Sequence, residues 1–401
     1  MTDIVIAGIG QTEVGEHWDI SLRELAYMAI RAALQDSGGL KPQALFVGNM
    51  LAPNLSNQAH LGALLTDHAG LTGNAPDAPD GVEAVTVEAA GASGGAALRQ
   101  GYIAVKSGMV DVALVVGVEK FTDKIGPDVE EAVATASDSD FEAMQGLTTT
   151  AQAALLMRRY MHEYNIPADG FVGFPLTAHA NGAGNKFAMF QKAIKAEMYT
   201  KAEMVSEPVN LFDIAPNADG AAAVVLTRRD LLPKDFPYPL VRIAGSGNSS
   251  DTLALHDRQD MLFFQAVQIA TQQALKKAGI TLEQVNFFEY HDAFSIYAAL
   301  SLEAAGFAPR GEGWKLAENG AITLAGSGDS RQTHIPCATM GGLKARGFPG
   351  GATGVYQAVE AALQLRGEAG PNQLNGARYG MIQSLGGPAS TVVCHILEKM
   401  N

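Results

Sequence analysis

Two distant stretches of the chain show the same order of structural signals. The first contains "IVIAGIGQTEVG" (residues 4–15), "LRELAYMAIRAALQDSGG" (22–39) and "QALFVGN" (43–49). The second contains "LVRIAGSGNSSDT" (240–252), "FFQAVQIATQQALKKAGI" (263–280) and "VNFFEYHD" (285–292). Each stretch predicts a strand, a glycine turn, an amphipathic helix that ends at glycine, and a further strand. The repeat favours two similar α/β halves in one chain, although two unrelated doubly wound domains would show the same alternation.

The pattern continues after each copy of the repeat. Residues 83–120 predict a strand, a turn, a helix and a strand, and residues 333–387 predict the same order. We therefore expect an N-terminal half over residues 1–230 and a C-terminal half over residues 239–401, joined by the proline-rich "LPKDFPYP". The first half also contains an insertion at about residues 121–208, and long insertions usually carry substrate contacts.

Composition argues against several classes of function. The formal net charge of −14 disfavours nucleic-acid binding, which needs a basic face. No apolar run approaches the roughly 20 residues of a membrane-spanning helix, and "MTDIVIAGIG" lacks the pattern of a signal peptide. Cys337 and Cys394 are too few for a disulfide framework or a metal cluster. We expect a cytoplasmic protein without a metal site, a membrane span or a nucleic-acid partner.

Nine motifs, in this order, resemble the thiolase superfamily, and the archaeal and sterol-carrier-protein-type branch in particular. They are "GNM…NQAHLGALL", "VEAAGASGGAAL", "VALVVGVEK", "RRYMHEY", "NADGAAAVVL", "EYHDAFSI", "LEAAGF…GEG", "GGLKARGFPGGATG" and "LRGEAG". The resemblance implies an α/β fold of five layers, built from two duplicated halves that each hold a mixed five-stranded sheet. It also implies a homodimer and a substrate that is a coenzyme A thioester, with no covalently bound cofactor.

The resemblance places the active site on four loops, two of which lack the family's reactive side chains. In "AAGASGG", Gly91 stands where the family carries its nucleophilic cysteine. In "GFPGG", Phe348 stands where the family carries the histidine of Gly-His-Pro. Glycine cannot be acylated and a phenyl ring cannot exchange a proton, so we expect chemistry without an acyl-cysteine intermediate.

The other two loops retain polar residues. In "EYHDAFS", the resemblance assigns His291 to the thioester oxygen, with Asp292 beside it. In "QSLGGP", Ser384 stands where some thiolases carry a second cysteine; it is a hydrogen-bond donor or simply a turn residue. We also expect the backbone N–H groups of the helix start at Ala92, Ser93 and Gly94 to bind an oxyanion.

Further candidates concern substrate binding. His60 follows "NLSNQA", which resembles a family segment close to the active site. Coenzyme A is polyanionic and this chain is acidic, so cations of the insertion such as Lys192 and Lys195 are candidates, although a solvated helix face would look the same.

Three functions follow from these observations. The first is retro-aldol cleavage of an acyl-CoA, by analogy with sterol side-chain aldolases, which share the fold, lack the cysteine and work with a small OB-fold protein. The second is a non-catalytic thiolase-like subunit of an acyltransferase complex. The third is an acetyl-CoA acetyltransferase, as overall similarity suggests.

Overall fold

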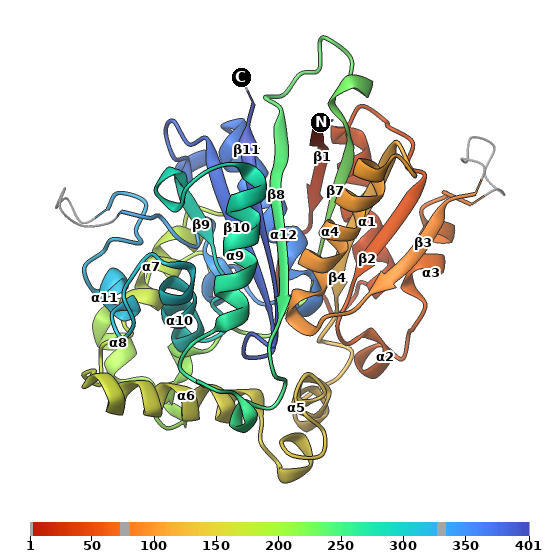
Figure 1. Cartoon of the computed structure of the whole chain (residues 1–401). Coiled ribbons are helices and arrows are strands. Elements are labelled where there is room, and N and C mark those ends of the chain that lie inside the picture. Colours follow the sequence, from red (N-terminus) through yellow and green to blue (C-terminus); the bar gives the residue numbers. More distant parts are fainter. Residues whose placement is uncertain (1–2, 73–80, 327–333, 401) are drawn as a thin grey trace.

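The centre of the molecule is a sheet of nine strands (Figure 1), seen in a computed structural model that describes residues 3–72, 81–326 and 334–400. In sheet order the strands are β3 (Glu83–Val87), β2 (Ala44–Gly48), β4 (Val112–Glu119), β7 (Gly220–Arg228), β1 (Ile4–Gln11), β8 (Val241–Ser250), β11 (Thr391–Lys399), β10 (Tyr379–Gly386) and β9 (Phe287–Glu289).

Strand directions confirm the duplication that the sequence repeat predicts. In the first half β2 is parallel to β3 and β4, and the pairs β4–β7 and β7–β1 are antiparallel. In the second half β9 is parallel to β10, and the pairs β10–β11 and β11–β8 are antiparallel. A parallel bridge between Phe288 and Cys337 occupies the place of β3. The predicted five-stranded sheets are thus joined through β1 and β8, and the second half has this bridge as its fifth member.

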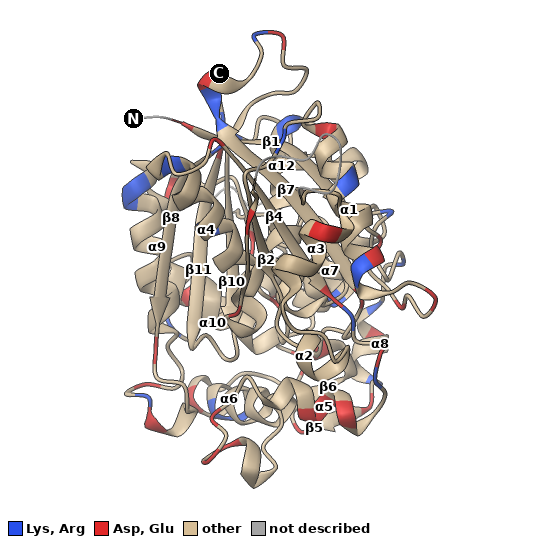
Figure 2. Ribbon diagram, turned by 90° about the vertical axis from the view of Figure 1, so that its right-hand side faces the viewer, with Lys and Arg blue, Asp and Glu red and all other residues tan. Residues whose placement is uncertain are grey.

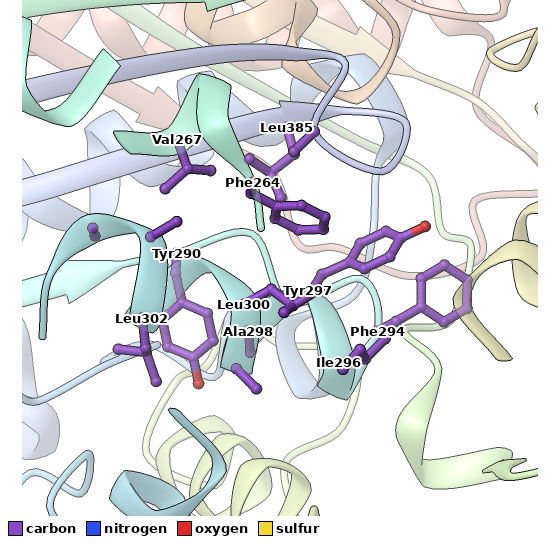
Figure 3. Packing of buried hydrophobic residues seen from close by; sticks show 14 of the residues in the cluster. Phe264, Val267, Tyr290, Phe294, Ile296, Tyr297, Ala298, Leu300, Leu302 and Leu385 are labelled. Atoms are coloured by element: carbon purple, nitrogen blue, oxygen red, sulfur yellow. The ribbon is translucent and has the colours of Figure 1, made fainter. Parts of the chain in front are cut away.

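Helices complete the five layers of the expected fold. Helix α1 (Leu22–Asp36) covers the outer face of the first half, and α9 (Gln265–Ala278) covers that of the second half. Between them, α4 (Ser93–Ser107) and α12 (Thr353–Arg366) contact each other and strands of both halves. Helix α12 is buried on nearly every side, and its buried side chains include polar ones such as Gln357 and Glu360 as well as apolar ones. Neighbouring α10 (Ser295–Ala305) is fully buried and forms a core cluster with α9 (Figure 3).

The insertion runs along the bottom of Figure 1 and up the left-hand side of the molecule. It contains α5 (Pro127–Ala134), α6 (Thr149–Tyr164), α7 (Gly173–Gly182), α8 (Ala196–Thr200), β5 (Met204–Ser206) and β6 (Val209–Asn210). Helix α6 begins after the capping side chain of Thr148 and ends at Asn165, which is left-handed with φ of 52°. The remaining helices are α2 (Ala52–Leu55), α3 (Leu61–His68) and α11 (Gly313–Glu318). Across the described residues, no helix has the length and apolarity needed to cross a bilayer.

Glycines allow α4 and α12 to meet at their starts. A Cβ atom at Gly354 would lie 2.1 Å from the backbone nitrogen of Gly95, and one at Gly94 would lie 2.7 Å from the carbonyl oxygen of Gly351. Such distances are far inside van der Waals contact, so any side chain at these positions would push the two helices apart.

We expect Gly354→Ala to lower the free energy of unfolding by about 2 kcal/mol or more, because the added methyl group forces the helix starts apart. Gly15→Ala is the matched control, since a Cβ atom there would have no heavy atom within 4 Å. Urea denaturation of both variants measures the difference, and equal stability would contradict the close helix contact.

Candidate active site

The four loops singled out by the sequence converge on one cavity of about 90 Å³. Gly91, His291, Phe348 and Leu385 each line it, one from each loop. The insertion closes the cavity with residues of α5 and of the start of α6, including Glu130 and Thr150. The cavity therefore lies between the two duplicated halves and beneath the insertion.

Gly91 lies where the first half touches the second. It belongs to a short 3-10 turn, η1 (Ala90–Ala92), that connects β3 to α4. The preceding Ala90 has φ of 50°, a strained conformation for a residue with a side chain. A Cβ atom at Gly91 would lie 2.6 Å from the carbonyl oxygen of Leu385 and 3.1 Å from Cε1 of His291. The surrounding backbone therefore leaves no space for a larger residue without a shift.

Two of the expected oxyanion donors after Gly91 are not free, which corrects the prediction for Ala92 and Ser93. The N–H of Ala92 donates to the carbonyl oxygen of Ala89 at 3.0 Å, and the N–H of Ser93 donates to that of Ala90. The Ser93 hydroxyl also donates to Ala90 O and accepts from Ala89 N. Gly94 packs against the start of α12. The 3-10 turn thus uses the N–H groups that an ordinary helix start leaves unpaired.

His291 presents a neutral imidazole to the cavity. The side chain is buried, and its Nδ1 has no hydrogen-bond partner. Burial, with a smaller effect of Arg346, lowers the pKa of His291 to about 3. The ring packs edge-on against Phe348, with 5.6 Å between centroids, and its Nε2 would lie 3.5 Å from a Cβ atom at Gly91. A neutral imidazole in this place can donate one hydrogen bond to a ligand oxygen.

Asp292 and Ser384 do not line the cavity, contrary to their predicted catalytic roles. Oδ1 of Asp292 accepts a hydrogen bond from the N–H of Leu343, and burial raises the pKa of this carboxyl group. The Ser384 hydroxyl donates to Oε1 of Gln357 at 2.9 Å, beneath the contact of α4 with α12. The Ser384 hydroxyl and Oδ1 of Asp292 are bonded within the protein, which indicates structural roles, although Oδ2 of Asp292 has no partner among the described residues.

A second cavity of about 470 Å³ adjoins the first, and Glu130, Thr150, Ile214 and Ala215 line both. Lys192 lines this outer cavity as a candidate cation, whereas Lys195 is exposed and does not line it. Lys344 also lines it; burial lowers the pKa of this lysine to about 8, and its Nζ donates to the carbonyl oxygen of Asp213. Figure 2 shows acidic residues on α5 in the same part of the molecule.

His60 is exposed and lines neither cavity, so its predicted contact with substrate has no support within this chain.

Sequence reasoning also missed polar residues that do line the inner cavity. Asn217 lies within the quoted motif "NADGAAAVVL", and Tyr297 lies six positions after His291, in the first turn of α10. The signal for Tyr297 was its place at the start of a helix that follows a site loop. Glu130 and Thr150 come from the insertion, whose sequence gave no sign of which residues face inward.

Neither cysteine reaches the cavity. Both are fully buried, and burial raises the pKa of each thiol, that of Cys394 to about 12. Cys337 donates to the carbonyl oxygen of Ile335 and Cys394 lies in β11. Within residues 3–72, 81–326 and 334–400, no cluster of three or more histidine, cysteine or acidic side chains could hold a metal ion.

Comparisons with known proteins agree with the fold. Residues 4–230 match the family model "Thiolase, N-terminal domain", and residues 247–399 match "Thiolase C-terminal domain-like". The chain is 39% identical over 401 residues to an "Acetyl-CoA acetyltransferase" of Methanothermobacter thermautotrophicus, covering 100% of both chains. It is 35% identical to a protein of the same name from Methanocaldococcus jannaschii, covering 99% of each. The solved structure "Ltp2-ChsH2(DUF35) aldolase" has a TM-score of 0.81 at 23% identity, over 99% of this chain and 98% of that chain, a likeness that concerns the fold alone.

We expect the stability difference between the wild type and His291→Gln to depend on pH. The unfolded chain protonates this histidine below a pKa of 6.5, whereas the folded chain keeps it neutral down to about 3. Lowering the pH across this range therefore destabilises the wild type, relative to the variant, by about 1.4 kcal/mol per pH unit. Urea denaturation from pH 7 to pH 4 tests this, because other buried groups contribute equally to both proteins. Parallel stability curves would show that His291 is not buried as a neutral base.

Proposed function

The chain belongs to the thiolase family, and we propose that its inner cavity binds an acyl-CoA thioester and supports carbon–carbon bond chemistry without acylation of a cysteine. One observation carries the proposal: a neutral His291 faces Gly91 and Phe348 in a cavity where, among the described residues, no thiol is present. We take Gly91 and Phe348 to occupy the positions of the family's nucleophilic cysteine and of its activating histidine.

Retro-aldol cleavage of a β-hydroxyacyl-CoA is the reaction that best suits these groups. It needs a base for the β-hydroxyl group and a hydrogen-bond donor for the thioester oxygen, on which negative charge develops. The neutral imidazole of His291 supplies the donor, because its N–H group can bond to that oxygen without bringing a charge of its own. No covalent intermediate is required, so the missing cysteine does not block this route.

A second candidate is acetyl-CoA acetyltransferase activity. The observation that favours it is the name of the two archaeal relatives, which are similar over essentially the whole chain. That activity in the usual thiolase form needs a nucleophile, and the two buried thiols offer poor ones. A non-catalytic subunit of an acyltransferase complex is the third candidate.

Partners and location also belong to the proposal. The name "Ltp2-ChsH2(DUF35) aldolase" describes an assembly of two proteins, and we propose that this chain likewise works with a small OB-fold protein. We further propose a homodimer in the cytoplasm, and a division at residues 1–230 and 239–401.

We expect the purified protein to gain no acetyl group when it is incubated with acetyl-CoA, and to release an aldehyde or ketone from a suitable β-hydroxyacyl-CoA. Intact-mass spectrometry and carbonyl derivatisation measure the two outcomes. A Cys337→Ser/Cys394→Ser variant is the control for acetylation. An acetyl group that the wild type gains and this variant does not would favour the acetyltransferase instead. Binding of the esters without any turnover would favour the non-catalytic subunit.

We also expect Lys192→Ala to weaken the binding of acetyl-CoA by about twofold to fivefold, the usual value of an exposed charge contact. The loss should shrink at high ionic strength because salt screens the interaction. Lys276→Ala, which removes an exposed lysine at the end of α9, is the matched control. Titration calorimetry at two salt concentrations provides the measurement, and equal affinities would exclude Lys192 as a phosphate contact.

A further inference from the structure

Two polar side chains that line the inner cavity each carry an atom without a hydrogen-bond partner among the described residues. One is Nδ1 of His291, which is buried, and the other is the hydroxyl group of Tyr297, which belongs to a side chain that lines the cavity and makes no hydrogen bond to a described residue. The two side chains are only 2% and 3% exposed. The Tyr297 hydroxyl is therefore free to bond to a ligand oxygen in the cavity, where the Nε2 side of His291 lies beside Gly91.

Aromatic neighbours fix the position of Tyr297. Its ring packs edge-on against Phe294 and Phe264, with 5.0 Å and 5.8 Å between centroids. Figure 3 shows its hydroxyl group at the far end of the ring, away from the body of α10. The hydroxyl of Tyr290, by contrast, points to the opposite side of the same view. Tyr297 is therefore a rigid donor at the cavity, and its orientation does not depend on a protein hydrogen bond.

Two charged groups near Tyr297 have opposite effects on its pKa. Burial raises the pKa of Tyr297 above its ordinary value, while the nearby Arg258 acts to lower it and Glu142 to raise it. Arg258 is itself buried and donates to the carbonyl oxygens of Thr252 and Pro388, which leaves its Nη2 without a partner. A guanidinium group held in this way stabilises the negative charge that a phenolate would carry.

We propose that Tyr297 is the catalytic acid and base of the cavity, and that it moves the proton of a β-hydroxyacyl thioester. The proposal rests on the function proposed above and assigns the base that retro-aldol cleavage requires. The phenolate of Tyr297 removes the hydroxyl proton, a carbonyl group forms at the β-carbon, and the bond between the α- and β-carbons breaks. The electron pair of that bond passes into the thioester, giving an enolate whose oxygen accepts a hydrogen bond from His291. The Tyr297 phenol then returns its proton to the α-carbon, so the products are a ketone or aldehyde and the shortened acyl-CoA.

The other titratable residues of the cavity are less suited to this step. Among the described lining residues they are Glu130 and His291. Glu130 is exposed to solvent at the rim that the two cavities share, and His291 has a pKa of about 3, which makes its imidazole a weak base. The phenolate of Tyr297 is a much stronger base than a carboxylate or this imidazole. The fraction of the protein that carries the phenolate then limits the rate of proton transfer.

The test is hydrogen exchange at the α-carbon of acetyl-CoA in D2O, followed by mass spectrometry. This exchange requires only enolate formation, so it needs no knowledge of the acyl group. We expect the wild type to exchange the α-protons and Tyr297→Phe to do so at least about 100-fold more slowly. The variant should keep its affinity for acetyl-CoA and its melting temperature, because the deleted hydroxyl has no partner within the protein. Tyr290→Phe is the matched control, since Tyr290 is equally buried but packs against Phe174 and Phe288 outside the cavity.

The pH dependence of wild-type exchange is an independent readout. If a buried phenol is the base, the rate after subtraction of the uncatalysed reaction rises about tenfold per pH unit from pH 6 to pH 9. A rate that is constant over this range would assign the proton transfer to a carboxylate such as Glu130 and overturn the proposal. Equal exchange by the wild type and Tyr297→Phe would overturn it as well, while leaving acyl-CoA chemistry at this cavity intact. A wild type that neither binds nor exchanges acetyl-CoA would refute the proposed function itself.

Discussion

The contact between the starts of α4 and α12 is the constraint on which the site depends. Gly94 and Gly95 meet Gly351 and Gly354 backbone to backbone, so the two duplicated halves approach as closely as chains can. Because α4 follows the Gly91 turn and α12 follows the Phe348 loop, this contact also fixes the two loops beside each other. Small residues are therefore needed here for geometry, whatever reaction the cavity supports.

The carboxylate of Glu119 strengthens the same junction. It accepts hydrogen bonds from the N–H groups of Met50 and Leu51 in the first half and of Gly351 in the second. Burial nevertheless raises its pKa to about 7, so the hydrogen bonds offset only part of the cost of desolvation. Other buried charges behind the cavity are paired in a similar way, as in the contact of Arg346 with Glu360. Paired groups of this kind hold the architecture and are not available to a ligand.

The fold was predictable because the order of strand, turn and helix signals along the sequence determines it. The site was less predictable because it depends on the local path of the backbone and on where each side chain points. The repeat that begins at Ile4 and Val241 predicts two halves, and the structure has them with matching strand directions. The four loops were also found from sequence. The pairing of the N–H groups after Gly91 was not found from the sequence. It follows from the positive φ of Ala90, which no sequence pattern indicates. The sequence also did not indicate that Asp292 is bonded to the N–H of Leu343 or that Tyr297 lines the cavity, because both follow from the local path of the chain.

Gly91 and Phe348 carry no group that could act as a nucleophile or a base, but the cavity that they line is present. His291 and Tyr297 line the cavity with Gly91 and Phe348, and neither Nδ1 of His291 nor the Tyr297 hydroxyl has a hydrogen-bond partner among the described residues. The inner cavity thus combines an absent nucleophile with a neutral imidazole, which can bond to a ligand oxygen, and a phenol, which can exchange a proton with the ligand. That combination favours a reaction that passes through an enolate over one that passes through an acylated side chain, because only the first needs no attacking atom from the protein.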